Sequence, residues 1–176
     1  MFEEFTQLSF WVDSAAGRMH FFAALFALVV GPFVLLRPKG SAFHRILGGL
    51  YVLVMLALNA SALTMFNLGR FNLFHLFALI SLATLIPAMV AISQAIRTRK
   101  AGWYHAHAHL MVWSYYGLVM AGAAQLFYRT IPRLTGSFES VDVFWVYVMP
   151  VCTLMTFFLT YRYIPKIVVN MGQAPT

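Results

Sequence analysis

From Ser14 to Phe138 the chain contains neither Asp nor Glu, although this stretch holds all six histidines of the 176-residue sequence. A carboxylate is costly in the hydrocarbon of a membrane, whereas a neutral imidazole is tolerated there and is a good metal ligand. The sequence therefore indicates a chain that folds in a lipid bilayer and carries histidines into it.

The composition predicts an all-α, polytopic integral membrane protein. Apolar residues make up 61% of the chain and charged residues 10%, which is too apolar for a soluble domain of this size. The apolar runs are continuous rather than alternating, so they indicate helices and not barrel strands. Each run suits a crossing of roughly 30 Å by about 20 residues. We expect a single transmembrane domain over residues 1–176 with five spans, at about 19–36, 46–69, 71–96, 105–128 and 143–161.

The basic residues predict how these spans are oriented. Eight of the twelve Lys and Arg residues fall on the side that holds the connections near residues 37–45 and 97–100 and the C-terminal tail. Cytoplasmic loops are enriched in Lys and Arg, so we expect the N-terminus outside and the C-terminus in the cytoplasm. This distribution explains the net charge of +7 without nucleic-acid binding.

Residues 1–17 do not read as a cleaved signal peptide, because Glu3 and Glu4 stand where basic residues are expected and Asp13 interrupts the apolar core. Their aromatic residues predict a short segment at the outer membrane interface. The single cysteine, Cys152, lies in the fifth span and is expected to be a small core residue.

The histidines fall at two depths in this topology. His20 and His75 lie at the outer ends of the first and third spans. A b-type haem needs two axial imidazoles on facing helices, so such pairs predict one haem near each membrane face, in a four-helix cofactor-binding core. The inner level is supplied by His44 on the second span and by the cluster His105, His107 and His109 on the fourth.

Helical geometry selects His107 from this cluster. At 100° per residue His107 shares its face with Ser114 and Gln125, and polar side chains in a lipid span point into the bundle. His105 and His109 share another face and form an alternative surface zinc or copper site, which lacks carboxylate or thiolate partners. The predicted iron ligands are therefore His20 with His75 outside and His44 with His107 inside.

Small and basic residues near these histidines fit a haem. Gly31 on the face of His20 and Gly48 one turn after His44 leave room for a flat ring, and Ser114 faces the same interior. The two propionates of a haem would pair with basic side chains at the membrane surface, although each such residue also serves as a helix-end anchor. The candidates are Arg18 and Arg70 at the outer level and Arg45 and Lys39 at the inner level.

The run from His44 to Tyr51 reads H-R-x-x-G-x-x-Y, and the run from His107 to Tyr115 reads H-x-x-x-M-x-x-S-Y. With the G-P-F of Gly31 to Phe33, these elements resemble the small bacterial membrane proteins grouped as domain of unknown function 2306. The resemblance singles out His44 and His107 and implies no activity. We expect the protein in the bacterial inner (cytoplasmic) membrane.

The arrangement is similar to that of the cytochrome b561 proteins, in which a four-helix core holds one haem near each membrane face. That similarity implies two b-type haems and one-electron transfer across the bilayer. The protein would then be a transmembrane oxidoreductase, surrounded by membrane lipid, with a quinone, a metal or a superoxide or oxygen species as redox substrate and a redox protein as a further partner.

Three other functions stay open. A copper- or zinc-binding membrane protein would use methionine with histidine, although methionines in apolar helices are usually packing residues. A small-solute transporter would have only histidine to relay protons within its spans. An assembly factor would bind no cofactor. The methionines in question are Met55, Met65, Met111 and Met120.

Overall fold

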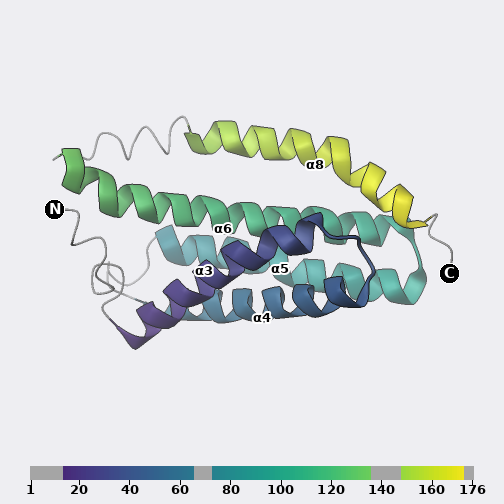
Figure 1. Ribbon diagram of the computed structural model, residues 1–176, viewed down its shortest axis with the longest axis horizontal. Coiled ribbons are helices and arrows are strands. Elements are labelled where there is room, and N and C mark those ends of the chain that lie inside the picture. The colour runs from purple at the N-terminus through teal and green to yellow at the C-terminus, as the bar shows by residue number, and fades with distance from the viewer. Residues whose placement is uncertain (1–13, 66–72, 136–147, 173–176) are drawn as a thin grey trace. The chain divides into compact units, whose positions relative to one another are not determined.

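The computed structural model describes residues 14–65, 73–135 and 148–172. These residues form five α-helices and no strand (Figure 1). The all-α prediction is therefore confirmed. In chain order the helices are α3 (Ala15–Leu36), α4 (Ala42–Thr64), α5 (Leu73–Thr98), α6 (Ala101–Thr135) and α8 (Met149–Gly172).

The chain forms two compact units, Met1–Ala83 and Thr84–Thr176, and their boundary falls within α5. In the first unit α3 packs against α4, and in the second α6 packs against α8. The organisation of residues 1–176 as one domain stays a prediction.

Three of the described helices are long and apolar enough to cross a membrane: α3, α4 and the part of α5 from His75 to Thr98. The passage of α6 and α8 through the membrane stays a prediction. α6 has 35 residues. At about 1.5 Å per residue such a helix is roughly 50 Å long, which exceeds the hydrocarbon thickness of roughly 30 Å.

Only the end of α3 at Leu36 coincides with an expected span limit, because those limits were drawn at charged residues; α8, for example, runs to Gly172 and not to residue 161. α3 begins at Ala15, because the Ser14 hydroxyl accepts a hydrogen bond from the Gly17 N–H at 3.0 Å and caps the helix. Residues 15–17 therefore belong to α3, and residues 1–13 of the expected interfacial segment lie outside the described residues. α6 runs on past the expected limit at residue 128 to Thr135.

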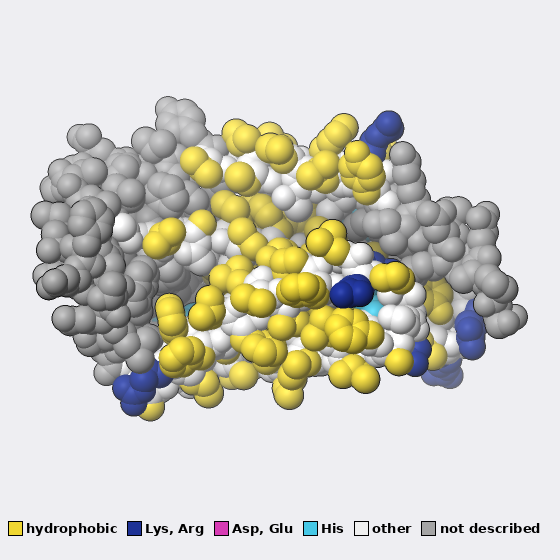
Figure 2. All heavy atoms as spheres, in the orientation of Figure 1, with side chains coloured by type: hydrophobic (Ala, Val, Ile, Leu, Met, Phe, Trp, Pro, Cys, Tyr) yellow, Lys and Arg dark blue, Asp and Glu magenta, His cyan; other side chains and the backbone are white. Residues whose placement is uncertain are grey.

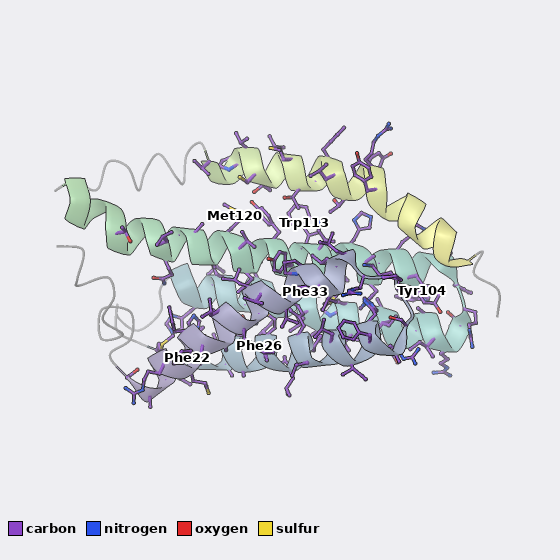
Figure 3. The ribbon with its side chains drawn as sticks, viewed as in Figure 1. Phe22, Phe26, Phe33, Tyr104, Trp113 and Met120 are labelled. Carbon is purple, nitrogen blue, oxygen red and sulfur yellow. The ribbon has the colours of Figure 1, made fainter. Side chains whose placement is uncertain are left out.

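Large hydrophobic side chains form an exposed face along α3. Phe22, Phe26 and Phe33 follow one another at helical spacing and are 41% to 52% exposed (Figure 3). Figure 2 shows further hydrophobic side chains spread over α3 and α4. The opposite face of α3 is buried and includes Ala27 and Val34. An apolar surface of this kind is the one that lipid covers in a membrane protein.

The connection between α5 and α6 consists of Arg99 and Lys100. Arg99 has a φ of 54°, in the left-handed region that residues other than glycine rarely adopt. Its N–H donates to the carbonyl oxygen of Ala95 at 2.9 Å, which closes the last turn of α5. The end of α5 and the start of α6 thus form a tight helical hairpin within the second unit.

Candidate histidine sites

His20 on α3 is hydrogen-bonded to α4. Its Nδ1 lies 3.2 Å from the carbonyl oxygen of Leu58 and 3.1 Å from the Ser61 Oγ. The Ser61 hydroxyl donates to the same Leu58 oxygen at 2.7 Å. A carbonyl oxygen can only accept, and the Ser61 proton is already used, so His20 Nδ1 carries the proton in both contacts. The Nε2 of His20 therefore keeps the lone pair with which imidazole binds a metal.

His107 on α6 is held in the same way within the second unit. Its Nδ1 donates to the carbonyl oxygen of Ala88 on α5 at 2.9 Å. This bond again leaves the lone pair on Nε2. A metal-ligating histidine usually donates its second ring N–H to a carbonyl or carboxylate, which fixes the tautomer and the orientation of the ring. His20 and His107 both meet this condition.

The two remaining candidates lie on α5 and α4. His75 is buried, with 2% of its surface exposed, and belongs with His20 to the first unit. His44 is half-buried in the first turn of α4, where its backbone N–H donates to the Ser41 Oγ at 3.1 Å. His44 lies in the first unit and His107 in the second. The pairing of His44 with His107 therefore stays a prediction, and so does that of His20 with His75.

The H-R-x-x-G-x-x-Y element places its His, Gly and Tyr on one face of α4. Along this face His44 and Gly48 are half-buried and Tyr51 is only 1% exposed. Arg45 lies outside the face and is exposed, and its guanidinium donates to the carbonyl oxygen of Gly40 at 2.7 Å. Within this motif, His44, Gly48 and Tyr51 face protein, whereas Arg45 lies on the surface.

The α6 face that carries His107 is buried further along the helix. Met111 and Leu118 are 6% exposed and Ser114 is 1% exposed. This burial agrees with the helical-angle argument that selected His107.

Another face of α6 turns to α8. Tyr116 forms a hydrogen bond with Thr153 of α8, and its ring meets that of Trp113 edge to face with 5.3 Å between ring centroids. Cys152, a free and half-buried cysteine, packs against the buried cluster of Met120 and Ala124, as expected for a small core residue. Figure 3 labels Met120 on α6. By helical spacing His105 and His109 share the face of Tyr116, and both are half-buried.

The glycines expected to make room for a haem lie on protein-facing sides. Gly31 is buried on the inward face of α3. A Cβ built on Gly48 would lie 3.8 Å from the Val34 Cγ1, so Gly48 faces α3 at this point. That these glycines leave room for a haem stays a prediction.

The described basic candidates lie at helix ends. Lys39 follows α3 and donates from Nζ to carbonyl oxygens there, among them that of Val34 at 3.3 Å, and burial lowers the pKa of its ammonium group. Arg18 is exposed in the first turn of α3. Arg70 lies outside the described residues. Pairing of any of them with a propionate stays a prediction.

A search for ionisable residues misses Asn59 and Ser61, which are buried polar residues of α4. Asn59 Nδ2 donates to the Met55 carbonyl oxygen at 2.8 Å and to the Ser81 Oγ on α5 at 3.0 Å. The rule applied to Ser114, that polar side chains of a lipid span face protein, would have found both.

In residues 14–65, 73–135 and 148–172 no three His, Cys, Asp or Glu side chains come together as a metal site. All five acids lie outside these ranges. Two imidazoles complete a haem, because the porphyrin supplies the other iron ligands. A pair of imidazoles would thus be enough for a haem, and the binding of one stays a prediction.

The family model described as "Predicted membrane protein (DUF2306)" matches residues 17–160. The chain belongs to this family. The DUF2306 match contains all four predicted histidine ligands and confirms the resemblance drawn from the two motifs. Its description supports a membrane location and gives no activity. No curated protein and no solved structure matches the chain.

Proposed function

We propose that this DUF2306 protein is a membrane b-type cytochrome that transfers single electrons across the bilayer through two bis-histidine haems. The ligands are His20 with His75 near the outer face and His44 with His107 near the inner face. The observation that supports this most is the shared state of His20 and His107, each of which donates from Nδ1 to a main-chain carbonyl and keeps its lone pair on Nε2.

The chain's own residues would hold and orient the cofactor. A bonded Nδ1 fixes the ring plane and raises the basicity of Nε2. The apolar helices would surround the imidazoles and exclude water. Basic side chains such as Arg18 and Lys39 stand at the helix ends, where propionates meet the interface. When bound, haem supplies one-electron chemistry, and the protein sets its potential through ligands, burial and nearby charge.

In this function the protein spans the inner membrane with its N-terminus outside. A reductant on one side would supply electrons, and a quinone, a metal or an oxygen species on the other would accept them. The protein would act as a transmembrane oxidoreductase.

The absorption spectrum of the full-length protein, purified in detergent from haem-replete cells, tests the proposal. We expect a Soret band that shifts on reduction with dithionite and about two haems per chain, as two bis-histidine sites require. Replacing His20 by Ala should remove the outer haem and spare the inner one. A colourless preparation refutes the proposal, and copper in such a preparation would point to a copper-binding protein instead.

A further inference from the structure

The Ser61 hydroxyl is an acceptor that its own helix has oriented. It is 2% exposed, and its proton is used in the 2.7 Å bond to the carbonyl oxygen of Leu58, three residues earlier on α4. Only its lone pairs are left for His20, whose Nδ1 lies 3.1 Å away. Ser61 therefore acts on His20 as an acceptor.

The N–H of His20 thus has two acceptors, the Leu58 carbonyl oxygen at 3.2 Å and Ser61 Oγ at 3.1 Å. Among the described residues, the N–H of His107 has one, the carbonyl oxygen of Ala88. A side chain can be exchanged by mutation and a main-chain carbonyl cannot, so Ser61 is the adjustable part of the support around His20.

We infer that Ser61 is a positioning residue that fixes the Nδ1-protonated tautomer of His20 and thereby lowers the reduction potential of the outer haem. The tautomer part depends on the hydrogen bonds alone, and the potential part rests on the proposed function. Acceptors on Nδ1–H raise the electron density at Nε2, which stabilises ferric over ferrous iron. Loss of one acceptor should therefore raise the potential.

The test compares Ser61→Ala with two matched variants. Ser61→Thr keeps a hydroxyl at the same position. Asn59→Ala removes a buried hydrogen bond from the same helix but no contact of His20. If the loss of structure alone were responsible, Asn59→Ala would have the same effect as Ser61→Ala.

The first measurement needs no haem. In full-length protein labelled with ¹⁵N-histidine, we expect His20 to be protonated at Nδ1. Ser61→Ala should shift the tautomer ratio toward Nε2 by about fivefold, the effect of one ordinary hydrogen bond. Ser61→Thr and Asn59→Ala should keep the wild-type ratio. An unchanged ratio in Ser61→Ala overturns the inference whether or not haem binds.

The second measurement is a redox titration of the haem-loaded protein. We expect Ser61→Ala to raise the midpoint potential of one haem and to leave that of the other unchanged. Ser61→Thr should have the wild-type midpoint potentials. If the midpoint potentials in Ser61→Ala equal those of the wild type, or if Asn59→Ala shifts them equally, the assignment of Ser61 as a positioning residue is overturned. If the tautomer ratio changes in a protein that binds no haem, the proposed function is refuted and the tautomer role of Ser61 stands.

Discussion

His107 donates from Nδ1 to the main-chain carbonyl oxygen of Ala88 across 2.9 Å, and this bond joins α6 to α5. His20 uses the same ring atom toward Leu58 of α4. Each compact unit therefore contains a histidine whose ring is held by a hydrogen bond to a neighbouring helix. A cofactor would meet ligands that are already oriented, so less conformational freedom is lost on binding.

The histidine cluster of α6 offers a sharp mutational test. Replacing His107 by Ala should lower the haem content by one per chain, because its Nε2 is the proposed iron ligand. His105→Ala and His109→Ala should keep the wild-type content, since both residues lie on another helical face. Haem per chain, measured by the pyridine haemochrome method, checks this. Loss of haem in His105→Ala with retention in His107→Ala would contradict the assignment.

The bond from Asn59 to Ser81 should stabilise the pairing of α4 with α5. Hydrogen bonds between membrane helices contribute about 0.6 kcal/mol on average and up to roughly 1.7 kcal/mol. A double-mutant cycle with Asn59→Ala and Ser81→Ala, followed by unfolding in mixed micelles, should give a coupling free energy in this range. Strict additivity of the two substitutions would show that the bond contributes nothing.

Gly40 and Gly49 should respond in opposite ways to alanine. Neither glycine has a neighbour within 4 Å of an added Cβ, but Gly40 has a φ of +81°. Gly40→Ala should cost about 1–2 kcal/mol, because a Cβ is strained in the left-handed region. Gly49→Ala lies within α4 and should stabilise by roughly 0.5–1 kcal/mol. Thermal unfolding of both variants in one detergent measures the difference, and equal shifts would contradict it.

The left-handed Arg99 predicts a stabilising substitution. Arg99→Gly should raise the free energy of unfolding by up to about 1 kcal/mol, because glycine adopts this conformation without strain. Lys100→Gly is the matched control, since it adds a glycine at a neighbour whose φ is not positive. The control should be neutral or destabilising. A lower melting temperature for Arg99→Gly than for Lys100→Gly would refute this account of the hairpin.

The orientation of the first spans can be read by cysteine labelling. In a Cys152→Ser background, single cysteines at the exposed positions Ser41, Thr64 and Lys100 mark three helix ends. In intact cells a membrane-impermeant thiol reagent should label Thr64→Cys and not the other two, which should react only after lysis. Labelling of Ser41→Cys in intact cells would reverse the predicted topology.

The helices themselves are largely predictable from the sequence, but their ends are not. Continuous apolar runs indicate each helix, because a backbone in lipid must satisfy its own hydrogen bonds. Charged residues mark where such a run leaves the hydrocarbon, and they do not end a helix. Arg18 lies inside α3, and α6 continues to Thr135, beyond the expected limit at residue 128.

The candidate site was predictable in part. Helical angle places His107 on a face that is buried at Ser114, as the structure has it. The hydrogen-bond acceptors of the His20 and His107 rings were harder to predict. The acceptor of His107 is a main-chain oxygen of Ala88, and a sequence pattern carries no sign of which carbonyl a ring will meet. The burial of Ser61 could have been predicted from the sequence, because a hydroxyl in an apolar span needs a protein partner.

The short link at Arg99 and Lys100 has a mechanical consequence for His107. Donor and acceptor of the His107–Ala88 bond sit on the two arms of one hairpin, so a piston-like movement of α6 would have to carry α5 with it. The position of the His107 ring along the helix axis is thus fixed by a residue nearby in the sequence, and it does not depend on contacts between distant parts of the chain. Contacts of such short sequence separation form early in folding. The His107 ring should therefore be in position before the rest of the protein has folded.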